Sequence, residues 1–330
     1  MSELFRAIAT EQLVAWICRE LDDRGSIFGI PRRYFYVPAT DAPYRARIFG
    51  QLLETPIGPA AGPHSQMAQN IIAAWLCGAR YFELKTVQTL DVLDVSKPCI
   101  DMEDEGYNVE WSQELKVYES FDEYLRAWVL VHALHDMLGF SGEAPGVVFN
   151  MSVGYDFAGI QQPNVQWFLD QMHDCSEYKQ SVVDEVAKFY PAVRDLEIPD
   201  CISDNVTLST MHGCPPGEIE RISSYLLRER GLHTLVKLNP TLLGPQRVRQ
   251  ILNQELNYRD ITVPDLAFEH DLDYADAVPM LTRLRACATE CGLEFGVKLT
   301  NTLEVENARP VFDASQEMSY LSGRPLHAIS

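Results

Sequence analysis

Polar side chains that suit a flat ring ligand recur where short apolar runs of the chain end. The set contains lysines, amides and hydroxyls, namely Lys85, Thr86, Asn150, Ser209, Lys237, Asn239, Thr300, Asn301 and Thr302. Amides and lysines supply the donors and acceptors that a planar heterocycle needs. Any one of them could instead be a polar strand end bonded to backbone. Their shared position after apolar runs therefore carries the prediction of a site.

One cysteine and two histidines add groups that could move protons. Cys214 stands in a Gly-Cys-Pro-Pro turn directly before an expected helix. That position can lower the pKa of a thiol, whereas an inert buried thiol is the alternative. His64 and His212 also follow apolar runs, and each could titrate near neutral pH or only pack. We expect no metal site, because no cluster of His, Cys, Asp and Glu has ligand spacing.

The stretch from Thr55 to Gln88 predicts the unit that positions the first of these groups. An apolar run ends in Ala60, Ala61 and Gly62, and a helical pattern closed by Gly78 follows. A second apolar run then leads into Lys85-Thr86. This pattern is typical of a strand–helix–strand crossover between parallel strands. The small residues at the first strand end would let a flat ligand lie against backbone.

The rest of the chain continues to alternate between the two patterns. Helices are expected at 3–22, 121–134, within 162–195, and at 218–230, 245–256 and 274–291. Strands are expected at 46–49, 146–151, 205–209, 235–238 and 295–302, with an extra strand at 266–269. Such alternation favours a parallel α/β architecture. We predict an N-terminal helix and ordered arm at 1–50 and a β/α barrel at 51–330, with an insertion at about 257–273.

Composition narrows the class of protein. The 330 residues carry a formal net charge of −20, which argues against nucleic-acid and anionic-membrane partners. No apolar run reaches membrane-spanning length, and no secretory signal is recognised. The eight cysteines are scattered without a CxxC pair, so a reducing cytoplasm is the simplest location. GxGxxG and Walker sequences are absent, which disfavours Rossmann and P-loop folds.

Six short motifs in a fixed order resemble a known family. TPIGPAAGP, ELKTVQ, YNVEWS, a TLS…CPP turn, VKLNP and TNT are similar to the flavin barrel of the dihydroorotate dehydrogenase superfamily. The strongest likeness is to the flavin-domain part of the selenate reductase iron–sulfur subunit family. The dihydropyrimidine dehydrogenase flavin domain is a more distant relative. The resemblance covers nearly the whole chain and implies a TIM (β/α)8-type barrel that binds FMN.

The resemblance also implies roles for individual residues. Those beside the flavin would be Ala60, Ala61, Gly62, Lys85, Thr86 and Lys237, with Ser322 and Gly323 near its phosphate. Those that bind the substrate would be Asn108, Asn301 and Thr302. Cys214 resembles the cysteine that exchanges a proton with the substrate double bond. A thiol on one face of the substrate and a flavin on the other would together transfer a proton and a hydride.

Two departures from the family pattern bear on these roles. Thr207 replaces the asparagine of the family's turn, and Thr210 to Gly213 are inserted before Cys214. These differences alter the turn that carries Cys214. The sequence also stops at SGRPLHAIS, where the family continues through two more strands and a phosphate loop. We therefore expect a barrel without its last two strands. The 4Fe-4S and FAD or NAD(P) modules occur only in longer relatives, and this chain holds no ligands for them.

These observations predict a flavin-dependent oxidoreductase module for electron transfer. Hydride would pass between FMN and a purine- or pyrimidine-like ring or another acceptor, and other redox domains or subunits would be partners. A non-catalytic barrel subunit or scaffold of a larger oxidoreductase complex is the alternative. A second alternative is an aldolase that forms a Schiff base on Lys85 or Lys237.

Overall fold

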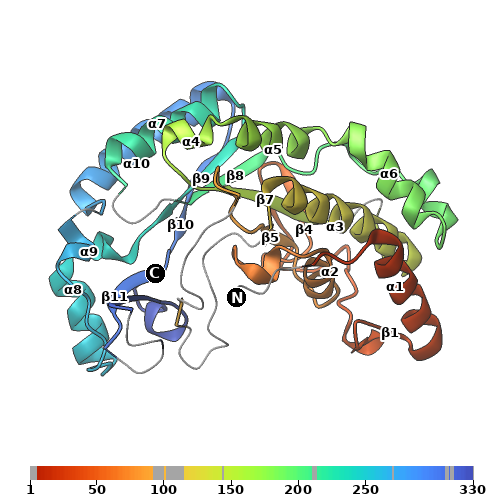
Figure 1. Cartoon of the computed structure of the whole chain (residues 1–330), viewed down its shortest axis with the longest axis horizontal. Coiled ribbons are helices and arrows are strands. Elements are labelled where there is room, and N and C mark those ends of the chain that lie inside the picture. The colour runs from red at the N-terminus through yellow and green to blue at the C-terminus, as the bar shows by residue number, and fades with distance from the viewer. Residues whose placement is uncertain are drawn as a thin grey trace. The chain divides into compact units, whose positions relative to one another are not determined.

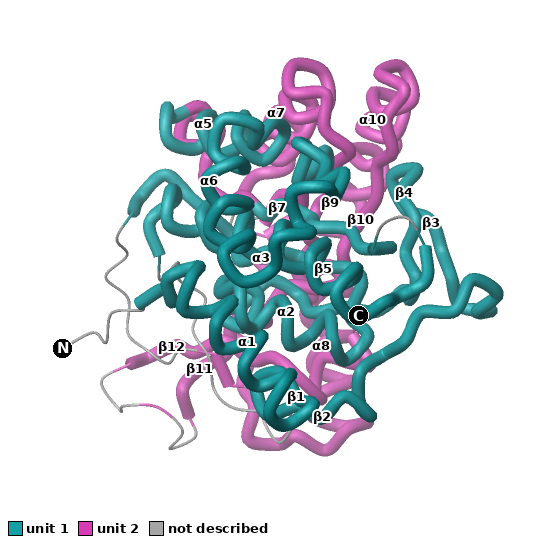
Figure 2. Tube along the Cα trace, turned by 90° about the vertical axis from the view of Figure 1, so that its right-hand side faces the viewer, with its two compact units in different colours: residues 1–92, 113–152, 162–205 teal, residues 93–112, 153–161, 206–330 magenta. Residues whose placement is uncertain are grey.

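The computed structural model describes residues 6–91, 100–101, 115–142, 145–209, 214–269, 271–308, 312 and 316–329. Two compact units make up the chain, and each draws on separate stretches of sequence (Figure 2). Unit 1 contains residues 1–92, 113–152 and 162–205, and unit 2 contains residues 93–112, 153–161 and 206–330. Figure 1 labels the helices and most of the strands.

Unit 1 begins with helix α1 (Thr10–Arg24), which is shorter than the helix expected at 3–22. Two small antiparallel hairpins follow, β1 (Ser26–Ile27) with β2 (Ile30–Pro31) and β3 (Ala46–Ile48) with β4 (Gln51–Leu53). The second hairpin confirms the strand expected at 46–49. Its turn residues, Phe49 and Gly50, both have positive φ, as the favoured two-residue hairpin turns require.

The core of unit 1 is a pair of parallel strands and the helices that pack beside them. Strand β5 (Tyr81–Glu83) pairs in parallel with β7 (Val148–Val153). The helices are α2 (Ala68–Leu76), α3 (Val117–Met137), α5 (Pro163–His173) and α6 (Ser176–Val186). The ring of Phe149 packs on Phe82 and on Trp128 of α3. This face of the strands is therefore the apolar core, and the next residues along β7 face the other way.

The first strand of the expected crossover is extended but is not a regular strand. The carbonyls of Ile57 and Pro59 accept hydrogen bonds from the backbone of β5, with Arg80 N at 2.8 Å and Glu83 N at 3.2 Å. Pro56 and Pro59 have no N–H group, so this segment cannot complete a ladder. The expected strand–helix–strand order is present, and the prolines explain why the first strand is incomplete.

Unit 2 repeats the pattern of parallel strands beside helices. Strands β8 (Asn205–Ser209), β9 (His233–Leu238) and β10 (Phe295–Leu299) are neighbours in that order. The helices are α4 (Phe157–Ile160), α7 (Pro216–Arg228) and α10 (Tyr274–Cys291). Buried and half-buried residues alternate along β9, and α7 packs against it. Thr234, Val236 and Leu238 thus form the helix-facing side, and Lys237 lies on the opposite side.

A smaller sheet and short helices complete unit 2. Strand β12 (Met318–Leu321) pairs with β11 (Leu303–Glu306) in antiparallel and with β6 (Ile100–Asp101) in parallel fashion. They pack with α8 (Pro245–Arg249), a π-helical turn at Gln250–Glu255 and α9 (Leu266–Glu269) around a common apolar cluster. Short 3-10 turns occur at Arg32–Tyr34, Pro63–Ser65, Pro191–Asp195, Pro240–Leu243 and Arg324–Leu326.

The prediction of an extra strand at 266–269 is wrong, because these residues form helix α9. Pro264 and Asp265 precede it and supply the carbonyls that accept its first backbone hydrogen bonds. Leu266 is 57 % exposed, so this apolar run does not form a buried strand. Among the described residues, no helix is both long enough and apolar enough to cross a bilayer.

Candidate active site at the strand ends

In unit 1, the parallel register brings a buried carboxylate beside a buried amide. Glu83 of β5 pairs with Asn150 of β7, and their side chains are 3 % and 0 % exposed. Asn150 Nδ2 donates to Asn205 Oδ1 at 2.8 Å. Phe149 occupies the helix-facing side, so Asn150 and Ser152 project from the other face of β7. The structure thus places the expected amide on the polar face of the parallel pair.

Lys85 and Thr86 continue alongside β7 after β5 has ended. The backbone N–H groups of Leu84 and Val87 donate to the carbonyls of Asn150 and Ser152, each at 2.9 Å. Thr86 Oγ1 lies 2.7 Å from Ser152 Oγ. Lys85 is 3 % exposed, and the hydroxyl of Tyr124 donates to its carbonyl at 3.1 Å. Ser152 is a member of this group that the sequence reasoning missed, because it lies inside an apolar strand.

The small residues at 60–62 are held in place by their neighbours. Ala61 N donates to Glu83 Oε2 at 2.9 Å, which ties this segment to the end of β5. Gly62 has extended backbone, and its N–H donates to Ser65 Oγ at 3.2 Å. His64 is exposed, and its Nε2 lies 2.8 Å from the carbonyl oxygen of Ala60. Glu83 is therefore a positioning residue, and no sequence signal distinguished it from a core polar group.

In unit 2, parallel pairing brings two lysines side by side. Lys237 of β9 and Lys298 of β10 are register partners, so both side chains project from the same face. Two residues earlier on the same face, Leu235 packs over Gly296. A Cβ on this glycine would lie 2.8 Å from the leucine side chain. Two lysines on one strand face concentrate positive charge there, which would attract a negatively charged group.

The ends of β9 and β10 form a hydrogen-bonded amide pair. Asn301 N and Thr300 Oγ1 donate to the carbonyl of Leu238 at 2.8 and 2.9 Å. Asn301 Nδ2 donates to Asn239 Oδ1 at 3.0 Å, and Thr302 N donates back to Asn301 Oδ1 at 3.0 Å. The contacts fix the orientation of both amides. Asn239 and Asn301, which are far apart in sequence, are thus brought together as expected.

The turn at Ser322-Gly323 lies next to Thr302. Leu303 pairs with Leu321 in the antiparallel ladder, so Thr302 and Ser322 are the next residues outward on the two strands. Ser322 N donates to the carbonyl of Asp101 at 2.8 Å, and Gly323 has a φ of 72°. The same end of unit 2 therefore contains Asn301, Thr302 and the serine–glycine turn.

Cys214 lies in an acidic environment that the sequence reasoning did not foresee. Burial, followed by the negative charges of Glu218, Asp271 and Asp156, raises the pKa of its thiol to about 11. The sequence left open whether the pKa of this thiol is lowered. The surroundings raise it instead, because they outweigh the position before α7. A thiol with a raised pKa stays protonated at neutral pH and can donate a proton. It is not poised to act as a nucleophile.

Three sequence candidates remain to be placed. Asn108 and His212 lie outside the described residues. Ser209 ends β8 and is half-buried. Within the described part of the chain, no group of three or more His, Cys, Asp and Glu side chains is placed to hold a metal ion. The candidate site residues are thus two sets, one on the polar face of each unit.

Comparison with known proteins identifies the family. The model of the family described as "Oxidoreductase YgfK, N-terminal TIM-barrel domain" matches residues 28–330. The chain belongs to this family. The expected α/β barrel class is thereby confirmed, in agreement with the parallel strands and helices of each unit.

Curated relatives and a solved structure extend the comparison. YgfK of Escherichia coli strain K12 and YgfK of strain O157:H7 are each 45 % identical over 349 aligned positions, covering 100 % of this chain and 33 % of the relative. The chain thus spans about a third of the length of these relatives. A crystal structure of ligand-free dihydroorotate dehydrogenase from Eimeria tenella is similar with a TM-score of 0.42 and 12 % identity. That match covers 88 % of this chain and 81 % of the other.

Proposed function

We propose that this chain is the flavin-binding barrel domain of an oxidoreductase. Hydride would pass between FMN and a purine- or pyrimidine-like ring or another acceptor. The family description supports redox chemistry, and the motif order supports a flavin barrel. The observation that carries the proposal is the Lys237–Lys298 pair followed by the Asn239–Asn301 amide pair at the ends of two parallel strands.

The side chains present fit the ring of a flavin. Its heterocycle carries carbonyl oxygens, ring nitrogens and an N–H edge, and amides can meet both donors and acceptors. Asn150 and Asn301 are buried or half-buried amides on the polar faces of their units. Lys237 and Lys298 would stabilise negative charge that builds up on the ring or on a phosphate. When bound, FMN would supply hydride chemistry that no side chain can perform.

The chain's own residues would bind and orient. Glu83 would hold Ala61 and Gly62 in an extended path, so that the ring could lie against backbone. Asn239 would hold the amide of Asn301 in one orientation, which favours a single pose of the substrate ring. The turn at Ser322-Gly323 would accept the phosphate end, since it adjoins Thr302.

Cys214 would hold the proton for the reaction. Its raised thiol pKa means that the proton is present at neutral pH and available for donation to a substrate carbon. The neighbouring carboxylates Asp156, Glu218 and Asp271 resist formation of a thiolate. This role differs from that of a nucleophilic cysteine, which needs a lowered pKa.

Flavin binding to the full chain tests the proposal. Titration of FMN, followed by quenching of its fluorescence, should show saturable binding near one equivalent. The Lys237→Gln variant should bind FMN about tenfold more weakly or worse, because it loses a charge-assisted contact. Lys188→Gln is the matched control, since Lys188 is exposed and pairs with Glu11.

The alternative of a non-catalytic scaffold makes the opposite prediction. A folded chain that shows no saturable FMN binding would contradict the flavin proposal and favour the scaffold. If the Lys237→Gln variant and the wild type bound FMN equally tightly, the assignment of FMN binding to this face of unit 2 would be contradicted. Cooperative thermal unfolding of each variant establishes that it is folded.

A further inference from the structure

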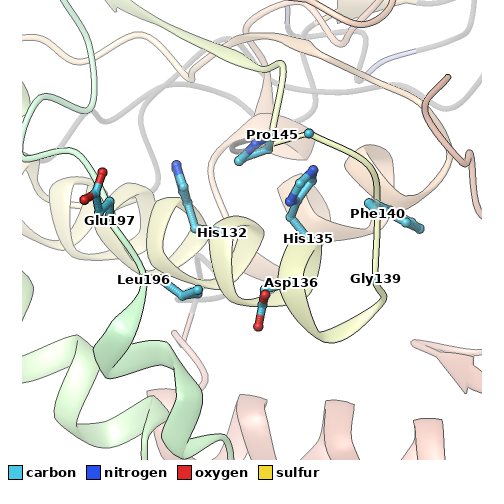
Figure 3. Close-up of a pocket in the computed structure, with 9 residues that line it drawn as sticks. His132, His135, Asp136, Gly139, Phe140, Pro145, Leu196 and Glu197 are labelled. Atoms are coloured by element: carbon cyan, nitrogen blue, oxygen red, sulfur yellow. The ribbon is translucent and has the colours of Figure 1, made fainter. Parts of the chain in front are cut away.

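A cavity in unit 1 lies away from the candidate site residues Asn150 and Ser152 of the same unit. It has a volume of about 190 Å³ and borders the C-terminal end of α3 and the segment before β7 (Figure 3). Its lining consists of His132, His135, Asp136, Gly139, Phe140, Gly142, Pro145, Leu196 and Glu197. Pro145 precedes β7, whereas Asn150 and Ser152 follow its first residues. The cavity and the candidate site therefore lie toward opposite ends of the same strand.

Two buried histidines form one wall of this cavity. His132 and His135 are three residues apart on α3, so they share a helix face, and they are 7 % and 5 % exposed. Figure 3 shows both rings projecting to the same side of the helix, with nitrogen atoms at their tips. The cavity is thus lined by two imidazoles that point the same way.

Each imidazole presents an acceptor nitrogen. His132 Nδ1 lies 2.8 Å from the carbonyl of Trp128, so Nδ1 carries the proton and Nε2 carries a lone pair. The backbone of Ser141 forms a hydrogen bond with the His135 ring. The Nε2 atom of His135 is buried and has no hydrogen-bond partner among the described residues. Burial lowers the pKa of both rings, to about 4 for His132, so both are neutral near pH 7. An unsatisfied buried nitrogen is costly, so a ligand with an N–H donor would be favoured.

The charges around the cavity favour a cation. In Figure 3 the Glu197 carboxylate lies on the same side of the helix as the two ring tips, and Asp136 points to the other side. Asp136 also accepts a hydrogen bond from the hydroxyl of Tyr190. Helix α3 ends at Met137, so the negative end of its dipole lies beside the cavity.

The two cations whose charges act on these histidines are already paired. Lys179, whose charge acts on His132, bonds Asp200 at 2.5 Å and the carbonyl of Ile198 at 2.6 Å. Arg80, whose charge acts on His135, pairs with Glu54. No lysine or arginine is among the residues that line the cavity.

We propose that this cavity binds a small organic cation through its ammonium group. The ammonium N–H groups would donate to Nε2 of His135 and of His132, and the positive charge would lie near Glu197. A metal ion is not the ligand that this geometry favours, because no described group of three His, Cys, Asp or Glu side chains could hold one. The proposal is independent of flavin binding.

The probe is n-propylammonium, titrated into the full chain at pH 7. Calorimetry should show saturable binding, with a Kd of about 1 mM for so small a ligand. The NMR signals of the His132 and His135 ring protons should shift with the same saturation. n-Propanol has the same size without the charge, and it should bind at least tenfold more weakly.

Variants connect the binding to this cavity. His135→Leu should abolish binding, because it removes the unpaired acceptor. Glu197→Gln should weaken binding several-fold while the fold is kept, since Glu197 is exposed. Glu177→Gln, at another exposed acid in unit 1, is the matched control and should bind like the wild type.

Three outcomes would overturn the proposal. The first is an absence of saturable binding by the folded wild type. The second is binding of n-propanol as tight as that of n-propylammonium, and the third is binding that leaves the His135 signal unmoved. If His135→Leu fails to fold, the Glu197→Gln variant decides, and unchanged affinity in that variant would contradict the proposed site.

Discussion

Single residues in this chain show how burial sets the energetics of polar groups. Arg80 is fully buried, and its Nε donates to Glu54 Oε2 at 2.6 Å. Its Nη1 donates to the carbonyls of Trp75 and Ala79, and its guanidinium lies over the ring of Tyr36. Sequence reasoning did not identify this pair, because an isolated Arg and Glu carry no pattern.

Removing Arg80 should destabilise the chain strongly. Arg80→Met leaves Glu54 buried without its cation, so the free energy of unfolding should fall by about 3 kcal/mol or more. Denaturant unfolding measures the change. The control is Arg283→Met, whose bidentate pair with Glu220 at 2.6 and 2.7 Å is exposed to solvent. If the two variants lost the same stability, burial would not be the cause.

His132 should make stability depend on pH. Burial, opposed by the Trp128 carbonyl and assisted by the charges of His135 and Lys179, lowers its pKa to about 4. The neutral ring favours the fold at pH values above the unfolded pKa of about 6.5, and this stability is lost as the pH falls toward 4. The loss between pH 7 and pH 5 should be about 2 kcal/mol.

Paired unfolding measurements at pH 7 and pH 5 test this effect. The His132→Gln variant cannot titrate, so its stability should fall by about 2 kcal/mol less than that of the wild type over this interval. His173→Gln replaces an exposed ring and should leave the pH dependence unchanged. A wild-type slope retained in the His132→Gln variant would assign the pH dependence to other groups.

At the scale of elements, close contact between two backbone segments determines how residues 56–62 pack against β5. Gly58 lies so close to the neighbouring strand that a Cβ would stand 1.5 Å from the carbonyl oxygen of Tyr81. The segment carries Ala60, Ala61 and Gly62 to the polar face of unit 1. The absence of a side chain at Gly58 is thus a condition for positioning these residues.

Gly58→Ala should separate this segment from β5. The backbone oxygen of Tyr81 cannot move without breaking the pairing, so the free energy of unfolding should fall by about 3 kcal/mol. Gly217→Ala in α7 is the control, because a Cβ there has no neighbour within 4 Å. That change should be neutral or stabilise by up to about 1 kcal/mol. Calorimetric melting of both variants makes the comparison, and an unaffected Gly58→Ala protein would refute the close approach.

At the scale of the whole molecule, the chain is an acidic α/β domain of the YgfK family composed of two compact units. In unit 2, Val297 and Leu299 of β10 are 43 % and 57 % exposed. Their register partners on β9, Val236 and Leu238, are buried. The helix-facing side of β10 thus has less cover than that of β9 in the described part of the chain.

The sequence by itself determined the order and type of most elements. Periodicity is local, so helix α10 and strand β8 agree closely with their predicted ranges of 274–291 and 205–209. The shared position of Lys85, Asn150, Lys237 and Asn301 after apolar runs was also visible. The four residues of α9 were predicted wrongly, because so short an apolar run cannot distinguish a strand from a helical turn.

Only the tertiary structure decided which polar groups meet and how they titrate. The Asn239–Asn301 contact and the partnership of Lys237 with Lys298 depend on strand register, which joins residues far apart in the chain. The raised pKa of Cys214 depends on burial and then on three carboxylates from separate segments. A hydrogen bond or a charge acts through distance in space, and spacing along the sequence does not contain that distance.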